Sequence, residues 1–384
     1  MSSQNLQDFS LLMKDAIFLA RNARPSPNPR VGAIILDKAG KIIGKGFHKN
    51  PGQPHAEINA ILDAKKNLKP SKLKSSSQPL KDCTLVCTLE PCCTFGRTPP
   101  CTDAIIREGI SHVIIGTKDP NPNVCGKGML KLIENNIKIT EGILSKDAEA
   151  MNEGYNYFIN HKKPLIILKA AISLDGKIST EKKDSKWISN EKSRKIVHFL
   201  RSKYDAILVG SGTVLKDNPK LTSRIKNGIN PLRVIIDSKL SIPISANVMN
   251  DKNVIIFTTS SCSKKKKEIL EKKCINVVIA ENNVVGSKKE SKKEVSLKKV
   301  ILHLSKMGIT SILVEGGSKI YNSFLKQKLA DKIILFIAPI IIGGKNSPSL
   351  LDEGFSTVKK SIKLHNYTFT QIDDNIMLEG FLDK

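Results

Sequence analysis

The spacing of hydrophobic residues divides the first 145 positions into alternating helices and strands. Apolar residues recur at helical spacing over 8–23, and short apolar runs bounded by turn-forming residues are typical of strands. A polar loop is expected at 69–81. The predicted helices are 8–23, 55–67, 101–109 and 126–136, and the predicted strands are 31–36, 41–47, 83–88, 112–117 and 137–139. This alternation favours an α/β sandwich built around one sheet.

The alternation starts again after a short connecting segment. Residues 145–164 carry one short predicted helix and end in a His-Lys-Lys-Pro run, which is typical of a linker. Beyond it, strands are predicted at 165–171, 205–209, 232–236, 253–257, 275–279, 311–314 and 332–338, and helices near 190–202, 264–272, 295–307 and 317–328. We therefore expect two α/β domains, at 1–147 and 164–384.

Composition agrees with a globular protein of this size. The chain has 384 residues, of which 40% are hydrophobic and 26% charged. The N-terminal segment has no basic start or small-residue cleavage site, so it predicts an amphipathic helix and not a signal peptide. No apolar run approaches the roughly 18 residues that a membrane span needs. Eight cysteines without an export signal indicate a reducing compartment. We expect a cytoplasmic protein without a membrane partner.

The net charge of +26 is compatible with more than one class of partner. A basic surface attracts nucleic acid, and it attracts phosphorylated small molecules equally well. Much of the excess lies in the single stretch 264–299, and lysine, isoleucine and asparagine are all abundant. This pattern is typical of compositional drift at tolerant surface positions. Charge therefore does not decide the function.

Four residues carry the clearest chemistry. His55 opens a predicted helix and Glu57 follows two residues later, while Cys92 ends a predicted strand and Cys101 begins the next helix. One imidazole and two thiolates suit Zn²⁺ and leave the fourth position open for water. A glutamate at this spacing can carry the proton from that water to a leaving group. Cys93 is an alternative ligand, although adjacent residues seldom aim both thiolates at one ion. A plainer interpretation makes His55 a helix cap and the cysteines buried thiols.

The pattern is similar to the signature H-x-E…P-C-x-x-C of nucleobase deaminases. It departs from that signature at the second thiolate, because the position three residues after Cys92 is Phe95. The spacing here is C-x8-C. Because of this insertion, the motif alone does not identify the substrate of the deaminase-like site.

Taken together, the motifs resemble the bifunctional riboflavin-biosynthesis deaminase–reductases. The matching stretches are PNPRVG at 27–32, HAEINA at 55–60, TLEPC at 88–92, GRTPPC at 96–101 and DPNP at 119–122. The resemblance implies a cytidine-deaminase-like α/β/α sandwich that deaminates a diaminopyrimidinone ribosyl phosphate. It places Arg97 on the substrate phosphate, and Asn28 and His48 on the pyrimidine edge and ribosyl chain. Thr94 stands where the family has a loop histidine, so the resemblance implies no imidazole contact with the substrate at this position.

The second domain has no G-x-G-x-x-G after its first strand, so a Rossmann fold is not expected. Its stretches 168–177, 185–189, 210–219 and 314–318 resemble the reductase half of the same family. That half has a dihydrofolate-reductase-like α/β fold and uses NADPH to reduce the ribosyl chain to ribityl. The resemblance implies NADPH contacts from Ala171, Trp187, Thr213, Asp217, Ser238, Gly317, Ser318, Lys319, Ile320, Tyr321, Asn322 and Ser323. It implies substrate contacts from Ser185, Arg201, Leu221, Arg224 and Glu315, and Lys169 is a further candidate near the reaction centre.

Two other functions compete with this interpretation. An RNA-acting adenosine or cytidine deaminase with a fused accessory domain would share His-x-Glu, but it predicts a C-x-x-C pair and no reductase-like half. A structural zinc protein that binds nucleic acid would need a fourth protein ligand. We therefore expect a small phosphorylated pyrimidine as substrate, zinc and NADPH as cofactors, and no nucleic-acid partner. The resemblance also implies a homo-oligomer.

Overall fold

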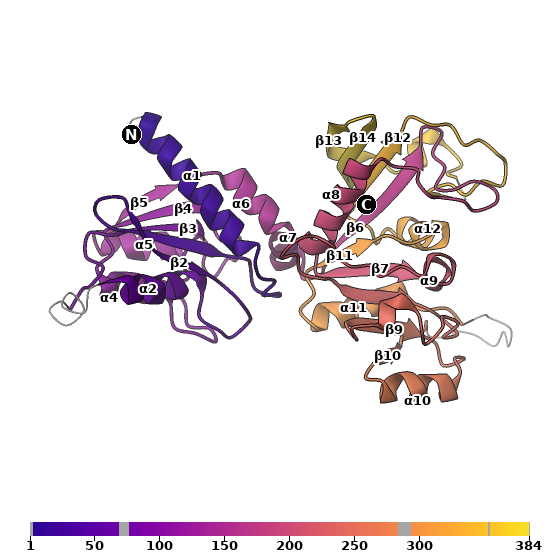
Figure 1. The fold of residues 1–384 in the computed structure, drawn as a ribbon, viewed down its shortest axis with the longest axis horizontal. Helices are drawn as coiled ribbons and strands as arrows, with labels where there is room; N and C mark the ends of the chain where they lie inside the picture. The colour runs from indigo at the N-terminus through magenta and orange to yellow at the C-terminus, as the bar shows by residue number, and fades with distance from the viewer. Residues whose placement is uncertain (1–2, 69–76, 283–292, 352–353, 384) are drawn as a thin grey trace. The chain divides into compact units, whose positions relative to one another are not determined.

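The computed structural model describes residues 3–68, 77–282, 293–351 and 354–383. Its contacts divide the chain into two compact units, Met1–Lys162 and Lys163–Lys384, each with its own sheet (Figure 1). The predicted loop at 69–81 and the lysine-rich stretch at 264–299 lie partly outside the described residues. No described helix has both the length and the apolar character that crossing a membrane requires.

The first unit contains a five-stranded sheet in the order β2-β1-β3-β4-β5. Strand β1 is antiparallel to both neighbours, while β3, β4 and β5 run parallel. The strands are β1 (Gly32–Leu36), β2 (Ile42–Phe47), β3 (Thr84–Leu89), β4 (His112–Thr117) and β5 (Lys138–Glu141). The helices are α1 (Ser3–Ala20), α2 (Ala56–Asn67), α4 (Cys101–Glu108), α5 (Lys127–Glu134), α6 (Ser145–Met151) and α7 (Glu153–His161).

Helices cover both faces of this sheet, because successive strand residues point to opposite sides. Leu85 and Val113 pack in one buried cluster with residues of α2, α4 and α5. Their chain neighbours Val86 and Ile114 pack in a second cluster with residues of α1 and α6. The predicted α/β/α sandwich is therefore confirmed, with the two helical layers visible on either side of the sheet in Figure 1.

Helix α2 lies directly on the backbone of β2. A Cβ atom added at Gly44 would come within 2.4 Å of the Ala60 carbonyl oxygen. One added at Gly46 would come within 2.3 Å of the Ala60 nitrogen and 2.4 Å of the Ala56 oxygen. Only glycine permits such an approach. These two positions fix the depth at which the first turn of α2 lies on the sheet.

The segment that the sequence analysis describes as a linker forms helices α6 and α7 within the first unit. Asn152 joins them to the start of β1, since its side chain accepts from the Arg30 nitrogen at 2.8 Å and donates to the Arg30 oxygen at 2.9 Å. The Tyr155 hydroxyl donates to Asp119 at 3.0 Å. Buried polar pairs of this kind hold a segment in one orientation. Two helices and these contacts therefore belong to the fold of the first unit.

The second unit contains a nine-stranded sheet in the order β10-β9-β8-β7-β11-β6-β12-β14-β13. All neighbours run parallel except the pairs that involve β14. The strands are β6 (Leu165–Ser173), β7 (Ala206–Gly210), β8 (Leu232–Ile236), β9 (Val254–Thr258), β10 (Asn276–Ile279), β11 (Ser311–Val314), β12 (Lys332–Ala338), β13 (Leu364–Ile372) and β14 (Asn375–Leu382). The helices are α8 (Glu191–Lys203), α9 (Ser211–Asp217), α10 (Lys264–Lys272), α11 (Leu297–Lys306) and α12 (Ser318–Lys326), with short 3₁₀ turns at Asn247–Met249 and Val358–Lys360.

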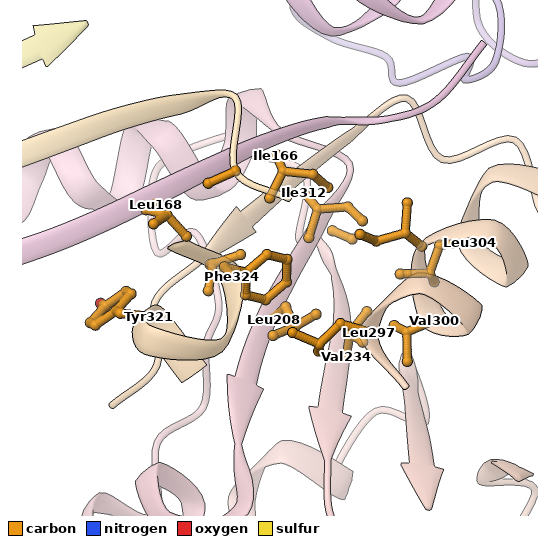
Figure 2. Packing of buried hydrophobic residues seen from close by; sticks show 14 of the residues in the cluster. Ile166, Leu168, Leu208, Val234, Leu297, Val300, Leu304, Ile312, Tyr321 and Phe324 are labelled. Atoms are coloured by element: carbon orange, nitrogen blue, oxygen red, sulfur yellow. The ribbon is translucent and has the colours of Figure 1, made fainter. Parts of the chain in front are cut away.

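Two apolar clusters fill the opposite faces of its parallel part. Leu208 packs with Phe324 of α12 and Val300 of α11 (Figure 2). The next residue, Val209, belongs to the cluster on the other face, which includes Leu270 of α10. The near-continuous apolar strands are those of a parallel sheet covered on both faces.

The C-terminal hairpin of β13 and β14 was not among the predicted strands. Strand β13 is the edge of the sheet, and all its residues except the two at its ends are exposed. An exposed strand has no buried face to impose an alternation of apolar and polar residues. This is why the hydrophobic pattern failed to identify it.

Candidate active sites

Three side chains of the first unit converge on one point. His55 caps the N-terminus of α2, Cys92 follows β3, and Cys101 is the first residue of α4. Their ligand atoms all lie within 4.8 Å of one another. His55 Nδ1 is 3.5 Å from the Cys92 sulfur and 3.4 Å from the Cys101 sulfur. A tetrahedral zinc ion with ordinary Zn–S and Zn–N bonds separates its ligand atoms by about 3.6 Å. The three residues therefore fit zinc.

The pKa values of the two thiols are shifted in opposite directions. The hydrogen bond from the Cys101 thiol lowers the pKa of Cys92, and the same bond raises the pKa of Cys101. The Cys101 backbone nitrogen also donates to the Cys92 sulfur at 3.4 Å. These contacts favour the thiolate form of Cys92. Thiolate is the form in which cysteine binds a metal.

Glu57 lies at the second position of α2 and is buried. Burial raises its pKa to about 7, with a further contribution from Cys92. A carboxyl group with a pKa near neutrality exchanges protons readily at physiological pH. Its position beside the ligand cluster suits a proton carrier that is not itself a ligand.

Asn28 and His48 meet beside the metal ligands. The Asn28 amide nitrogen is 3.1 Å from His48 Nε2, and His48 Nδ1 is 3.3 Å from the Pro54 carbonyl oxygen. Burial lowers the pKa of His48 and so favours the neutral ring. With its proton on Nδ1, that ring donates to the Pro54 oxygen and accepts from the Asn28 amide. The His48 ring stands edge-on to that of His55, with centroids 5.0 Å apart. Arg97 is exposed in the loop between the two cysteines.

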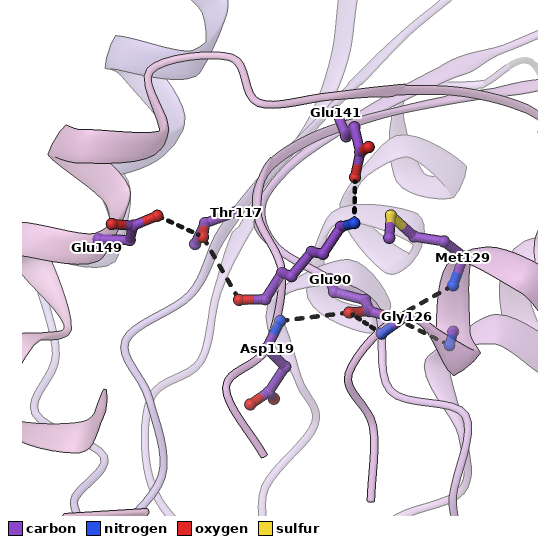
Figure 3. Close-up of polar contacts among 9 residues, drawn as sticks. Glu90, Thr117, Asp119, Gly126, Met129, Glu141 and Glu149 are labelled. Carbon is purple, nitrogen blue, oxygen red and sulfur yellow. Dashed lines mark hydrogen bonds and ion pairs between the residues drawn. The ribbon is translucent and has the colours of Figure 1, made fainter. Parts of the chain in front are cut away.

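Glu90 is a structural residue of this site that the sequence analysis missed. It is buried, and its carboxylate accepts four backbone N–H groups (Figure 3). Two belong to Asp119 and Gly126, at 3.3 and 2.9 Å, and two to Gly128 and Met129 in the first turn of α5, at 3.0 and 3.3 Å. A carboxylate here caps the helix and fixes the loop before it. The available signal was an acidic residue directly after a buried strand.

In the second unit, a cavity of about 930 Å³ lies over the carboxyl ends of the parallel strands. Its walls include Gly210 at the end of β7, Ile236 at the end of β8 and Glu315 after β11. Ligands of open α/β sheets bind at this edge. The sequence-predicted residues that line it are Lys169, Ala171, Ser185, Thr213, Asp217, Ser238, Glu315, Gly317, Ser318, Lys319, Ile320, Tyr321 and Ser323.

The other five predicted residues of this unit do not line the cavity. Trp187 is 70% exposed and stacks against the Arg194 guanidinium, 4.6 Å from the ring centroid. Leu221 and Asn322 are buried, and Arg224 is exposed. The fifth, Arg201, pairs with a residue of the cavity wall. The sequence analysis in turn missed several lysines of the wall, namely Lys183, Lys216, Lys239 and Lys293.

A buried charge cluster forms the floor of this cavity. Both carboxylate oxygens of Glu315 accept from Arg201, at 2.9 and 2.8 Å, and the Lys169 ammonium is 3.7 Å away. Burial alone would raise the pKa of Glu315, but the positive charges of Arg201 and Lys169 outweigh it and lower the pKa to about 2. Burial lowers the pKa of Lys169. The Tyr321 hydroxyl donates to the Lys169 backbone oxygen at 2.5 Å.

Comparisons with known proteins match both units. A family model for the cytidine and deoxycytidylate deaminase zinc-binding region matches residues 6–117, and one for the RibD C-terminal domain matches residues 164–378. The riboflavin biosynthesis protein RibD of Aquifex aeolicus is 38% identical over 95% of this chain and 96% of its own length. That of Bacillus amyloliquefaciens is 39% identical over 95% and 94%.

Solved structures agree over the full length. The crystal structure of a diaminohydroxyphosphoribosylaminopyrimidine deaminase/5-amino-6-(5-phosphoribosylamino)uracil reductase from Thermotoga maritima has a TM-score of 0.76 and 36% identity. It covers 99% of this chain and 100% of its own. RibD of Acinetobacter baumannii has the same TM-score with 28% identity, 99% coverage of this chain and 100% of its own.

Proposed function

The chain belongs to the RibD family of bifunctional deaminase/reductases of riboflavin biosynthesis, and from that premise we propose which residues perform each reaction. The first unit deaminates the diaminopyrimidinone ribosyl phosphate named for its Thermotoga maritima relative, and the second reduces the resulting phosphoribosylaminouracil. The convergence of His55, Cys92 and Cys101 beside the buried Glu57 is the observation that carries this assignment.

In the deaminase, His55, Cys92 and Cys101 hold the metal. Zinc, when bound there, acts as a Lewis acid that makes water a nucleophile at neutral pH. Glu57 takes a proton from the attacking water and delivers it to the departing amino group. Its raised pKa of about 7 supports both halves of this transfer. Asn28 and the neutral His48 face the pyrimidine and ribosyl groups, and Arg97 binds the phosphate.

In the reductase, bound NADPH would supply the hydride, and the residues of the chain position the cofactor and the substrate. Ala171, Thr213, Asp217 and Ser238 contact NADPH, together with residues 317–323, whose glycine precedes the N-terminus of α12, where backbone N–H groups favour a phosphate. Trp187 is also assigned to NADPH. Lys169, Ser185 and Glu315 of the cavity wall contact the substrate. The resemblance also assigns Arg201, Leu221 and Arg224 to the substrate, although they lie outside that wall. The Arg201–Glu315 pair lies under the cavity, so it orients Lys169 within it.

A coupled assay tests both halves. The purified protein with zinc, NADPH and the diaminopyrimidinone ribosyl phosphate is expected to release ammonia and oxidise NADPH, each once per substrate molecule. With the pre-deaminated uracil compound, only NADPH oxidation is expected. Failure to oxidise NADPH on either substrate would contradict the reductase assignment, and absence of ammonia release would contradict the deaminase assignment.

We also propose a cytoplasmic homo-oligomer that binds no nucleic acid. All eight cysteines are free thiols, which suits a reducing compartment. Strand β13 leaves one edge of the sheet uncovered, with Tyr367 and Phe369 more than half exposed. A long uncovered edge strand pairs readily with another chain. Sedimentation of the wild type and of Phe369→Lys tests this, with a lower mass expected for the variant.

A further inference from the structure

The loop between the two cysteine ligands is held to the metal site by one side chain. Most of residues 93–99 are exposed, including Arg97, but Thr98 is half-buried. Its hydroxyl oxygen lies 3.3 Å from His55 Nε2. Within the described residues, this is the side-chain hydrogen bond that joins the loop to the rest of the unit; the Gly96 nitrogen donates to the Thr98 oxygen inside the loop.

The geometry of His55 fixes the direction of this hydrogen bond. Its Nδ1 faces both sulfur atoms, at 3.5 and 3.4 Å, so Nδ1 must carry the lone pair that binds the metal. The ring proton is then on Nε2, where Thr98 Oγ1 is the acceptor. Partners of this kind fix the ring orientation of a metal-binding histidine.

We propose that Thr98 is a positioning residue of the deaminase, which orients the His55 imidazole and couples metal binding to the loop that carries Arg97. The role in substrate binding rests on the proposed function, whereas the role in metal binding does not. A metal bound at Nδ1 would fix the His55 ring, and the hydrogen bond from Nε2 to Thr98 would then fix the loop. Because coupling of two binding events is reciprocal, an ordered loop also favours the bound metal.

The C-x8-C spacing supplies the physical reason for this arrangement. With seven residues between Cys92 and the buried Pro100, the loop runs from the end of β3 past the Nε2 atom of His55 before it reaches α4. A loop of this length needs an anchor to present a guanidinium at a fixed place, because ordering each residue costs about 1–2 kcal/mol of conformational entropy. Thr98 lies next to Arg97, so its anchor acts where the phosphate contact is made.

The test compares Thr98→Val with a matched control. Valine keeps the branched shape and removes the acceptor, while Thr98→Ser retains it. Thr140→Val removes an equivalent threonine–histidine bond elsewhere in the unit, since Thr140 Oγ1 lies 2.9 Å from His112 Nε2 on neighbouring strands. Zinc affinity of the full-length protein is measured by competition with a chromophoric chelator. Thr98→Val is expected to weaken zinc binding by about 10- to 100-fold, and the other two variants are expected to match the wild type.

A second measurement separates positioning from folding. At saturating zinc, Thr98→Val is expected to raise KM for deamination more than it lowers kcat, with reductase activity and melting temperature unchanged. Wild-type zinc affinity in Thr98→Val would overturn the proposal, as would equal losses in Thr98→Val and Thr140→Val. If Thr98→Val does not fold, Thr98→Ala in the same exposed loop gives the same readout. Zinc affinity needs no substrate, so its outcome is independent of whether the wild type deaminates.

Discussion

The two units place their sites in the same way but encode them differently. Each site lies where strands end and helices begin in an α/β sheet. The deaminase site gathers its metal ligands and Glu57 from two short segments, 55–57 and 92–101. The reductase cavity takes its walls from positions between Lys169 and Pro348. The first site is therefore a local motif, and the second is a product of the whole sheet.

This difference follows from the chemistry that each site requires. A zinc ion accepts few ligand types and holds them in a fixed geometry, so the necessary residues are identifiable wherever they occur. A dinucleotide requires a cavity of suitable size and polarity, and the walls here combine small residues such as Gly210 and Thr213 with larger ones such as Lys216. Many residue types satisfy that requirement. Removing a single side chain should therefore nearly abolish the activity of the first unit, whereas in the second unit it should lower the activity only in part.

Metal removal is expected to separate the two activities most sharply. Cys101→Ala, or chelation of the wild type, should lower deamination by about ten-thousandfold, because both water activation and substrate polarisation are lost. NADPH oxidation on the uracil substrate should not change. Parallel ammonia and NADPH assays measure both rates. Loss of both activities together would mean that the second unit depends on the metal.

Glu57→Gln should have the next largest effect. The amide cannot carry a proton, so deamination should fall by roughly a hundred- to a thousandfold. Zinc content should stay at the wild-type value because Glu57 is not a ligand, and reduction of the uracil substrate should be unchanged. Metal analysis and both rate assays check this. Deamination at the wild-type rate would refute the role assigned to Glu57.

The buried carboxylate of Glu315 in the second unit should make the free energy of unfolding depend on pH. The folded-state pKa of Glu315 is about 2, below the ordinary value of 4.5, so its ionised form stabilises the fold above pH 4.5 and this stability is lost as pH falls toward 2. The full contribution is about 3 kcal/mol. The difference in unfolding free energy between wild type and Glu315→Gln should therefore shrink over this range.

The chain offers a probe for that measurement. Trp187 is the sole tryptophan and lies in the second unit, so denaturant unfolding followed by its fluorescence reports on that unit. A difference between the two proteins that stays constant from pH 6 to pH 2 would contradict the assignment.

Trp187 itself should give the smallest effect. Its ring is 70% exposed and outside the cavity wall, with Arg194 stacked on one side. If its other face contacts NADPH, Trp187→Ala should raise KM for NADPH by roughly two- to tenfold, and Trp187→Phe should raise it less. Steady-state kinetics at varied NADPH measure both. An unchanged KM in the alanine variant would limit Trp187 to its contact with Arg194.

The hydrophobic pattern predicted the central strands and helices because each has a buried face. It missed β13, which is exposed along nearly its whole length, and β14, whose buried positions include Asn375 and Gly380, which are not apolar side chains. The convergence of His55, Cys92 and Cys101 could be predicted from their residue types and their spacing in the sequence. The hydrogen bonds to Glu90 could not be predicted, since the backbone N–H groups that donate to it lie far along the chain and any residue type supplies such a group. The acidic residue directly after a buried strand was the one signal that Glu90 offered. The pairing of Arg201 with Glu315 could not be predicted either, since it depends on which strands become neighbours.

The two glycines under helix α2 have a consequence for how this lysine-rich chain can change over generations. Lysine is abundant along the chain, but positions 44 and 46 have room for a hydrogen atom alone. Any side chain there would displace the first turn of α2, which begins at Ala56, and with it His55 and Glu57. Such a mutation would touch no substrate and no metal, yet it would be selected against as an inactivating one. Two positions on the outer strand of the sheet are thus under the same constraint as the catalytic residues.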